Sequence, residues 1–393
     1  MTQMPRMRDY DGPAILSQGF RPFFLFGAIY AGLAILLWLP VFSGAATLET
    51  AFAPRDWHIH EMLYGYLPAV VTGFLLTAVP NWTGRLPLRG TPLLTLVAVW
   101  GAGRIAISVS AWTGWVLAAS VDCGFLLAVA FVTAREIAAG KSWSNMKVLV
   151  AIGLLLAGNV IFHIEAHFNG VADYGARLGV AAIIMLIMLI GGRIVPSFTR
   201  NWLARQKAGR LPVPFGTYDI VSMAVSGGAL AAWIAAPEWR PGGDALIIAG
   251  LLQAVRLARW AGYRTLRDRL VLILHLAYAF IPAGFILTGL SALTEVPASA
   301  GIHAWMAGAA GGMTLAVMSR TSLGHTRRAL LAAPATQAVY LLVLTGALAR
   351  IAAALQPEWG AGLLHFAGLS WAAAFLGFAA VYWGTLTRPS LKR

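Results

Sequence analysis

The sequence is dominated by apolar runs that are each long enough to cross a membrane, and these runs constrain the fold more than any other feature. About 20 predominantly apolar residues suffice for a transmembrane helix. We count twelve such runs, separated by Pro, Gly and charged clusters: 23–43, 57–80, 91–109, 113–134, 147–167, 174–196, 217–236, 244–262, 270–291, 301–319, 335–355 and 360–386. Only 11% of the residues are charged, against about 25% in soluble proteins. The sequence predicts an all-α, polytopic membrane protein with twelve transmembrane helices in a single domain, 1–393.

The basic residues of the chain alternate from loop to loop, and this pattern predicts its orientation. Of the 29 Lys and Arg residues, 21 lie at the two termini and in every second loop, whereas the opposite loops hold only Arg55 and Arg240. Cytoplasmic loops of membrane proteins carry the excess of Lys and Arg. We therefore expect both termini in the cytoplasm. The net charge of +14 then needs no nucleic-acid partner, and membrane lipid is the expected surrounding.

Three sequence patterns narrow the possible chemistry. The chain has one cysteine, Cys123, so it can form no intrachain disulfide. It contains no CxxCH sequence, which excludes covalent c-type haem attachment. It also contains no GxxxxGK[ST] loop, which argues against a pump driven by nucleotide hydrolysis.

The predicted orientation places most histidines in one layer. His163 follows Lys147, at the cytoplasmic start of its segment, by 16 residues, or about 24 Å of helix, and so lies near the outer surface. Six of the eight histidines share this layer: His58, His60, His163, His167, His303 and His365. The other two, His275 and His325, fall near the inner side. A single histidine at this depth is more often a hydrated interfacial group, but six in one layer favour ligation of a metal or haem iron.

The second segment carries two of these histidines on opposite sides. One stripe of small and polar residues is predicted to face other helices: His58, Glu61, Gly65, Ala69 and Thr72. His60 points about 200° away from His58 on an ideal helix. The two histidines therefore serve different sites, or one of them is interfacial. Glu61 is a candidate to orient the imidazole of a liganding histidine.

Other polar residues inside apolar runs need partners. His163 and His167 share a helix face at a spacing of four, as two ligands of one metal must, and His163 is the better candidate because His167 lies closer to the surface. Arg104, Asp122 and Arg193 require ion pairs or proton relays if they remain charged. Arg193 and Arg200 are also candidates to clamp an anion, such as a haem propionate or a phosphate.

A weak internal repeat is also visible. Pro80, Arg200 and Arg320 follow each other at intervals of 120 residues, near the ends of three apolar segments with similar sequences. This spacing suggests three units of four helices. Coincidence between apolar segments of similar length is the alternative.

Several stretches resemble the NnrS family of bacterial membrane proteins. They are GFRPFF (19–24), WHIHEMLYGY (57–66), GFLLTAVPNWTG (73–84), GGRIVPSFTRNWL (191–203), LHLAYAFIPAG (274–284) and HAWMAGAAGGMTLAVMSRTSLGHTRR (303–328). The resemblance implies a protein of the bacterial inner membrane that contains haem and copper and acts in nitric oxide metabolism, denitrification or relief of nitrosative stress. The histidines that match the family are His58, His60, His163, His275, His303 and His325.

The plan of the chain is also similar to the catalytic subunit of haem–copper oxidases, in which histidines of the second and tenth helices hold a low-spin haem. By analogy we expect a b-type haem between His303 and His58 or His60, and the number of haems, one or two, stays open. The seventh segment and the sixth contain no histidine, so the usual copper site of that superfamily is missing. Any copper would need other ligands, such as His163 with one of the pair in the second segment.

The sequence leaves several functions open. A cofactor protein that binds nitric oxide or nitrosylated iron could be an oxidoreductase, a sensor or an electron carrier, and its electron donor is unknown. A secondary transporter with twelve helices is an alternative, although such proteins place substrate sites near the membrane midplane. A metal-handling scaffold without redox chemistry is a third interpretation.

Overall fold

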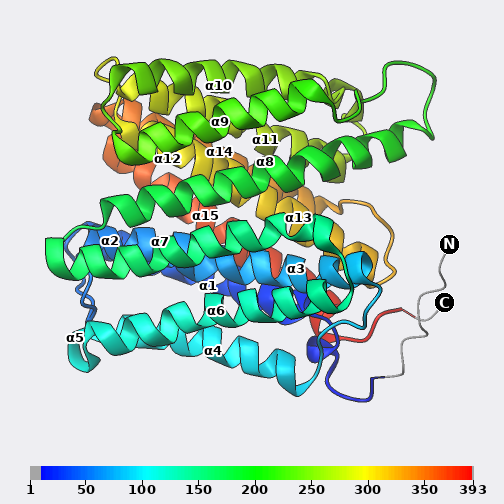
Figure 1. The fold of residues 1–393 in the computed structure, drawn as a ribbon, viewed down its shortest axis with the longest axis horizontal. Coiled ribbons are helices and arrows are strands. Elements are labelled where there is room, and N and C mark those ends of the chain that lie inside the picture. The colour runs from blue at the N-terminus through cyan, green and yellow to red at the C-terminus, as the bar shows by residue number, and fades with distance from the viewer. Residues whose placement is uncertain (1–9, 392–393) are drawn as a thin grey trace. The chain divides into compact units, whose positions relative to one another are not determined.

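In the computed structural model, the described part of the chain, residues 10–391, is all-helical and contains no strand. Both chain ends, on which the predicted cytoplasmic termini depend, lie outside the described residues. The principal helices are α1 (Phe20–Phe42), α2 (Pro54–His60), α3 (Leu67–Thr83), α4 (Thr91–Ser108), α5 (Ser110–Thr113), α6 (Trp115–Ala139), α7 (Lys147–Asn169), α8 (Asp173–Leu203), α9 (Thr217–Ala235), α10 (Arg240–Ala258), α11 (Arg269–Ser291), α12 (Ala298–His303), α13 (Gly312–His325), α14 (Pro334–Leu355) and α15 (Gly360–Thr387) (Figure 1).

Two of the predicted transmembrane segments contain π-helical turns. The second segment runs continuously through α2, the π-helical segment η2 (Glu61–Tyr66) and α3. The tenth runs through α12, η5 (Ala304–Gly311) and α13. In each case the π-helical turn begins directly after a histidine, His60 or His303. Such turns are rare and often mark functional positions.

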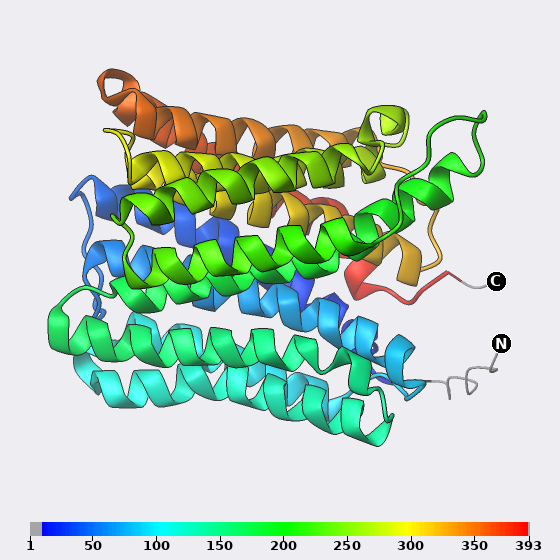
Figure 2. The ribbon, with the colours of Figure 1, turned by 45° about the horizontal axis from the view of Figure 1, so that its top comes forward.

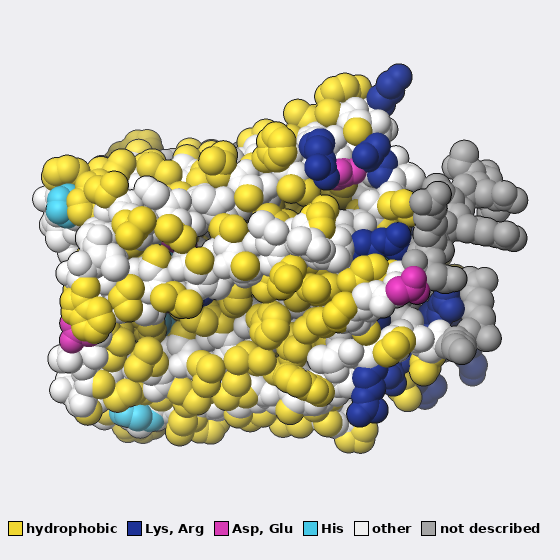
Figure 3. All heavy atoms as spheres, turned by 90° about the horizontal axis from the view of Figure 1, so that it is seen from below, with side chains coloured by type: hydrophobic (Ala, Val, Ile, Leu, Met, Phe, Trp, Pro, Cys, Tyr) yellow, Lys and Arg dark blue, Asp and Glu magenta, His cyan; other side chains and the backbone are white. Residues whose placement is uncertain are grey.

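Ten helices among the described residues are long and apolar enough to cross a membrane, so the chain is a multi-pass membrane protein by length and composition. On the face drawn in Figure 3, apolar side chains are spread over the surface, and most of the Lys and Arg side chains gather at the right of the view. The expected count of twelve is not confirmed. The segments predicted at 244–262 and 301–319 do form helices, α10 and α12–η5–α13, but they are not among these ten. Asp244, Gln253 and Arg256 make α10 more polar, and glycines lower the hydropathy of the other segment. The threefold repeat is likewise not confirmed.

The chain divides into two compact units: Met1–Gly179 with Thr321–Arg328 and Ala379–Arg393, and Val180–Arg320 with Ala329–Phe378. The prediction of a single domain stays a prediction. Helices α8, α13 and α15 each contribute to both units.

In the first unit, α3 packs against α1 and α6, and α6 packs against α4 and α7; α4, α6 and α7 run side by side in both ribbon views (Figure 2). The GFRPFF sequence at the start of α1 builds part of this core. Phe20, Phe23 and Phe24 are fully buried. The guanidinium of Arg21, also buried, donates to the carbonyl oxygens of Thr385, Leu386 and Arg388, which satisfies acceptors that the end of α15 would otherwise leave open.

In the second unit, α10 packs against α9 and α11, and η5 packs against α11 and α14. A buried ion pair joins Arg256 Nε on α10 to Asp219 Oδ1 on α9 at 2.9 Å. The same guanidinium donates to the Tyr278 hydroxyl at 3.0 Å, so the buried charge of Arg256 is paired inside the unit.

Candidate metal centre

The helices of the first unit bring a group of polar side chains together in its interior. The members are Tyr30 on α1, His60 at the end of α2, Glu61 in η2, Arg104 on α4, Asp122 on α6, and Asn159 and His163 on α7. His60 and Glu61 are 0% exposed, and Asp122 and His163 are 2% exposed. Buried polar groups inside a membrane protein are expensive and mark functional positions by default.

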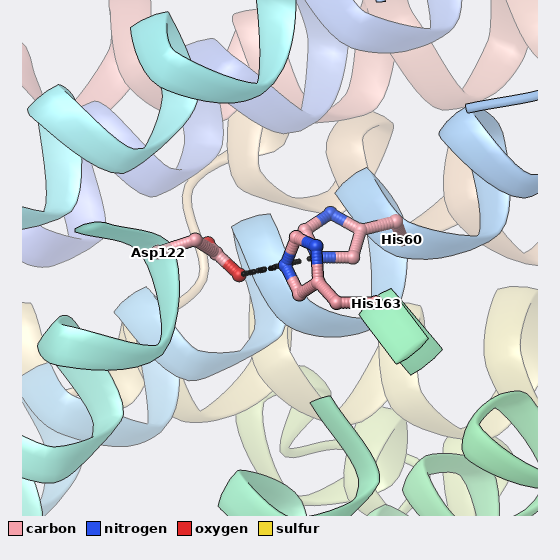
Figure 4. Close-up of side chains that lie close together, drawn as sticks. All are labelled: His60, Asp122 and His163. Atoms are coloured by element: carbon pink, nitrogen blue, oxygen red, sulfur yellow. Dashed lines mark hydrogen bonds and ion pairs between the residues drawn. The ribbon is translucent and has the colours of Figure 1, made fainter. Parts of the chain in front are cut away.

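At the centre of this group, two histidines face one carboxylate oxygen (Figure 4). His60 Nε2 and His163 Nε2 each lie 3.2 Å from Asp122 Oδ2. The three residues could hold a metal ion, because one ligand atom from each lies within 4.8 Å of the others. They are the one group of three or more potential ligands of this kind among residues 10–391.

The spacing of these atoms suits a small metal ion. Ligand atoms bound at about 2.0–2.1 Å in tetrahedral geometry lie roughly 3.3 Å apart, close to the two distances of 3.2 Å. Two imidazole nitrogens and one carboxylate oxygen are ligands that zinc, copper and iron accept. The group therefore has the donor types of a transition-metal site, and two of its three ligand separations match tetrahedral geometry.

Both ring nitrogens of His60 face acceptors. Nδ1 lies 2.8 Å from Glu61 Oε1, and Nε2 lies 3.0 Å from Asn159 Oδ1 as well as near Asp122. A neutral imidazole has only one N–H to donate. The arrangement therefore calls for a cation at His60, either a second proton on the ring or a metal ion at Nε2. With a metal at Nε2, Nδ1–H would donate to Glu61, as orienting carboxylates do for metal-bound histidines.

Arg104 connects the two carboxylates of the group. Its Nη1 lies 2.6 Å from both oxygens of Glu61, and its Nη2 donates to Asp122 Oδ1. The Tyr30 hydroxyl also donates to Glu61, and Asn159 Nδ2 donates to Asp122 Oδ2 at 2.7 Å. Every member of the group is thus held by at least one other.

A glycine in η2, Gly65, leaves room for the guanidinium of Arg104. A Cβ on Gly65 would lie 2.6 Å from Arg104 Nη1 and 3.0 Å from Glu61 Oε2, so only glycine leaves the guanidinium its place. Trp100, one turn before Arg104, donates from Nε1 to the carbonyl oxygen of Gly65 at 2.9 Å and fixes α4 against η2.

Aromatic rings enclose the two histidines. The ring of Phe52 lies 4.9 Å from that of His60 and 5.2 Å from that of His163. Phe162 packs against His60 at 5.3 Å, and the fully buried Tyr64 lies 5.6 Å from it. This apolar enclosure excludes water and strengthens electrostatic interactions inside it.

The stripe predicted on the second segment is corrected by the structure. Glu61, Gly65, Ala69 and Thr72 are buried as expected. His60, predicted to point away from this face, is fully buried, whereas His58 is half-buried and its ring stacks on Trp38 at 4.7 Å. The prediction allowed only one packed face on this segment, but other elements enclose it on several sides, and Phe52 and Phe162 pack against His60.

The remaining predicted ligands are not members of the three-residue group. His167 is exposed and stacks on Trp115 at 4.5 Å. His325 is exposed and its ring lies 5.7 Å from Phe20. His275 belongs to the second unit, is buried, and its Nε2 lies 2.8 Å from Thr199 Oγ1. His303, half-buried in the second unit, has Nδ1 2.7 Å from the Ser299 carbonyl oxygen.

The predicted anion clamp and the predicted haem are not tested by this arrangement. Arg193 and Arg200 are both exposed on α8, and Arg200 Nη2 donates to the Pro212 carbonyl oxygen at 2.7 Å. The predicted haem joins a histidine of the first unit to His303 of the second. Both stay predictions.

Sequence reasoning did not assign Asp122 or Asn159 to the site. Asp122 was recognised as a carboxylate in an apolar run that needs a partner, and the structure gives it one in Arg104. Its partners on α4 and α7 lie 18 to 41 residues away in the chain, and helix periodicity gives no information about such pairings. Asn159 carried no signal at all.

The fold and this site define a multi-pass, all-helical membrane protein with a buried histidine–carboxylate group. The chain matches the family described as NnrS protein over residues 14–390. It therefore belongs to the NnrS family. A comparison with curated proteins gave no match.

Proposed function

We propose that the chain is a metalloprotein of the bacterial cytoplasmic membrane that acts in nitric oxide metabolism or in relief of nitrosative stress. Membership of the NnrS family suggests the link to nitric oxide. The observation that carries the proposal of a metal is the approach of His60, Asp122 and His163 to within 4.8 Å inside a buried, aromatic-lined space.

We further propose copper as the occupant, with the Nε2 atoms of His60 and His163 and one oxygen of Asp122 as ligands. Imidazole nitrogens suit copper, and three protein ligands leave a coordination position open. When bound, such an ion would supply a site at which nitric oxide can coordinate. The residues of the chain then orient the ligands through Glu61 and exclude water through the rings of Phe52 and Phe162.

The three-residue group suits a single ion better than a haem iron. Each nitrogen of His60 faces side-chain oxygens, at 2.8 to 3.2 Å, where a porphyrin would have to lie. His303 suits haem ligation better, because a contact between Nδ1 and a backbone carbonyl orients Nε2 of ligating histidines. We propose His303 as a ligand of a b-type haem, and His58 remains the candidate in α2.

The proposal includes twelve transmembrane passes with both termini in the cytoplasm. Helix α10 has 19 residues, or about 28 Å, close to the roughly 30 Å of a bilayer core. The α12–η5–α13 segment is longer. Counting both gives an even number of passes, as the positions of the basic loops require.

The test uses the full chain purified in detergent, with metal analysis and visible spectra recorded in the oxidised, reduced and nitric oxide-treated states. We expect copper at one ion per chain in the wild type and its loss in His163→Ala. His167→Ala is the matched control, because His167 lies one turn further on α7 and outside the group. Spectral changes on addition of nitric oxide that require His163 support the proposed function. A folded preparation without histidine-dependent metal would contradict it and would favour the transporter interpretation.

A further inference from the structure

We infer that Arg104 sets the charge of the ion that this centre accepts, and that it makes the centre selective for a singly charged ion such as Cu(I) over a doubly charged ion such as Zn(II). The inference rests on the proposed function, since it concerns the same three ligands. It assigns a specificity-determining role to a residue that touches none of the ligating nitrogens.

Arg104 first determines which carboxylate oxygen is available to the ion. Its Nη2 donates a hydrogen bond to Asp122 Oδ1, whereas the Nε2 atoms of His60 and His163 face Oδ2. Asp122 can therefore bind an ion through one oxygen only. The same guanidinium holds Glu61 through Nη1, and Glu61 contacts His60 Nδ1. Arg104 thus positions one ligand directly and a second through Glu61.

The hydrogen bonds fix the charges of this group. Both oxygens of Glu61 accept from Arg104, and one also accepts from Tyr30. Asp122 accepts from Arg104 at one oxygen and from Asn159 at the other. Both groups are paired with the guanidinium of Arg104, and an opposite charge at this distance favours the ionised carboxylate. Arginine stays charged in proteins. Histidines that ligate a metal are neutral imidazoles, so two carboxylates and one guanidinium leave the ion's surroundings with a net charge of −1.

Other acidic groups on the same helices are engaged elsewhere. Asp56 on α2 accepts from the backbone N–H of Ala172 at 2.9 Å. Glu165 on α7 accepts from the N–H groups of Tyr174 and Gly175 at 3.1 and 2.7 Å. Both bind backbone at or just before the start of α8, where negative side chains are stabilised, so we leave them out of the charge balance of the centre.

A singly charged ion makes the group neutral, whereas a doubly charged ion leaves a net +1 in a buried space. Unbalanced buried charge is costly. One unit of charge about 6 Å from the ion, at an effective dielectric constant of about 20, changes the relative affinity of ions that differ by one charge by roughly 100-fold. Arg104 is therefore expected to shift selectivity by about this factor.

The experiment measures Cu(I) and Zn(II) affinities of the detergent-purified full chain by competition with chelators of known affinity at one pH. Both ions have filled d shells, so charge is a principal difference between them. We expect Arg104→Gln to raise the ratio of Zn(II) to Cu(I) affinity roughly 100-fold. Arg104→Lys, which keeps the charge, and Glu61→Gln/Arg104→Gln, which restores the net −1, should both stay near the wild-type ratio. Arg135→Gln is the control, because Arg135 pairs with Glu136 on the exposed side of α6.

The outcomes separate this inference from the function on which it rests. An unchanged ratio in Arg104→Gln, with binding that still requires His163, would overturn the role of Arg104 and leave the metal centre intact. A double variant that behaves like Arg104→Gln would show that hydrogen-bond geometry, not charge, sets the preference, and would also overturn the inference. Absence of histidine-dependent binding in the wild type would remove the metal centre itself.

If Arg104→Gln does not fold, a variant that changes the net charge in the opposite direction still tests the inference. Glu61→Gln retains Arg104 and raises the net charge to zero. We expect it to lower Zn(II) affinity more than Cu(I) affinity, again by roughly 100-fold in the ratio. Equal losses for the two ions would contradict the inference.

Discussion

Gly65→Ala is the smallest change that should disturb the centre without touching any proposed ligand. The new Cβ would lie 2.6 Å from Arg104 Nη1 and 3.0 Å from Glu61 Oε2, both inside van der Waals contact. The guanidinium must move, because the backbone of η2 is held between α1 and α4. Movement lengthens its two contacts of 2.6 Å to Glu61.

The magnitude follows from two opposing effects. Hydrogen bonds to charged groups contribute about 1.5–3 kcal/mol each, and overpacking a filled interior costs about 1–3 kcal/mol. Replacing a helical glycine by alanine stabilises the helix by about 1 kcal/mol. We expect a net loss of about 2–3 kcal/mol in the free energy of unfolding, together with a lower metal content because Glu61 no longer fixes His60.

The assay is thermal unfolding in detergent, followed by intrinsic fluorescence, with metal analysis of the same samples. Gly101→Ala is the matched control: Gly101 lies one turn before Arg104 on α4, and a Cβ there meets no described atom within 4 Å. We expect Gly101→Ala to be neutral or slightly stabilising. If Gly65→Ala unfolds at the same temperature as Gly101→Ala and retains its metal, the close packing of Arg104 does not support the centre and the reasoning is refuted.

Three further changes test contacts in both units by the same unfolding assay. Tyr30→Phe removes the hydroxyl that donates to Glu61 and should cost about 1–2 kcal/mol while metal stays bound. Arg21→Met removes the donor that satisfies the end of α15; it should cost about 2–4 kcal/mol and speed proteolysis of the C-terminal residues. Thr199→Val leaves His275 Nε2 without its 2.8 Å contact and should cost about 1–2 kcal/mol.

Thr345→Val is the common control for these three changes, because the half-buried Thr345 hydroxyl donates to carbonyl oxygens of its own helix. Any of the three variants that unfolds together with this control would show that its buried contact contributes nothing measurable. Tyr30→Phe would also contradict the charge analysis of Glu61 if it released the metal, since both carboxylates keep Arg104.

Most helix boundaries could be predicted from the sequence because length and hydropathy determine them locally. The segment predicted at 147–167 is α7, Lys147–Asn169, and the one predicted at 335–355 is α14, Pro334–Leu355. The twelve-pass count was not confirmed because α10 is helical but polar and because glycines lower the hydropathy of α12–η5–α13. Its Arg256 finds a partner in Asp219, and a hydropathy profile contains no such information about tertiary pairing.

The centre itself was predicted only in part, for two physical reasons. His60, His163 and Glu61 were candidates because ionisable groups in apolar runs are unusual, and the structure brings these three together. Helix periodicity assigned one packed face to the second segment, whereas the structure also buries the opposite side, where Phe52 and Phe162 contact His60. To assign Asp122 and Arg104 to the site, one must know which faces of α4, α6 and α7 meet. This depends on the packing of whole helices, which the sequence does not give locally.

The most direct test of the central claim is X-ray absorption at the copper edge on copper-loaded protein. The proposed centre predicts nitrogen and oxygen neighbours at about 2.0 Å, with the outer-shell pattern of two imidazole rings, and loss of one ring in His163→Ala but not in His167→Ala. A spectrum without imidazole scattering, or one that is unchanged by His163→Ala, would contradict the assignment of the ion to His60, Asp122 and His163.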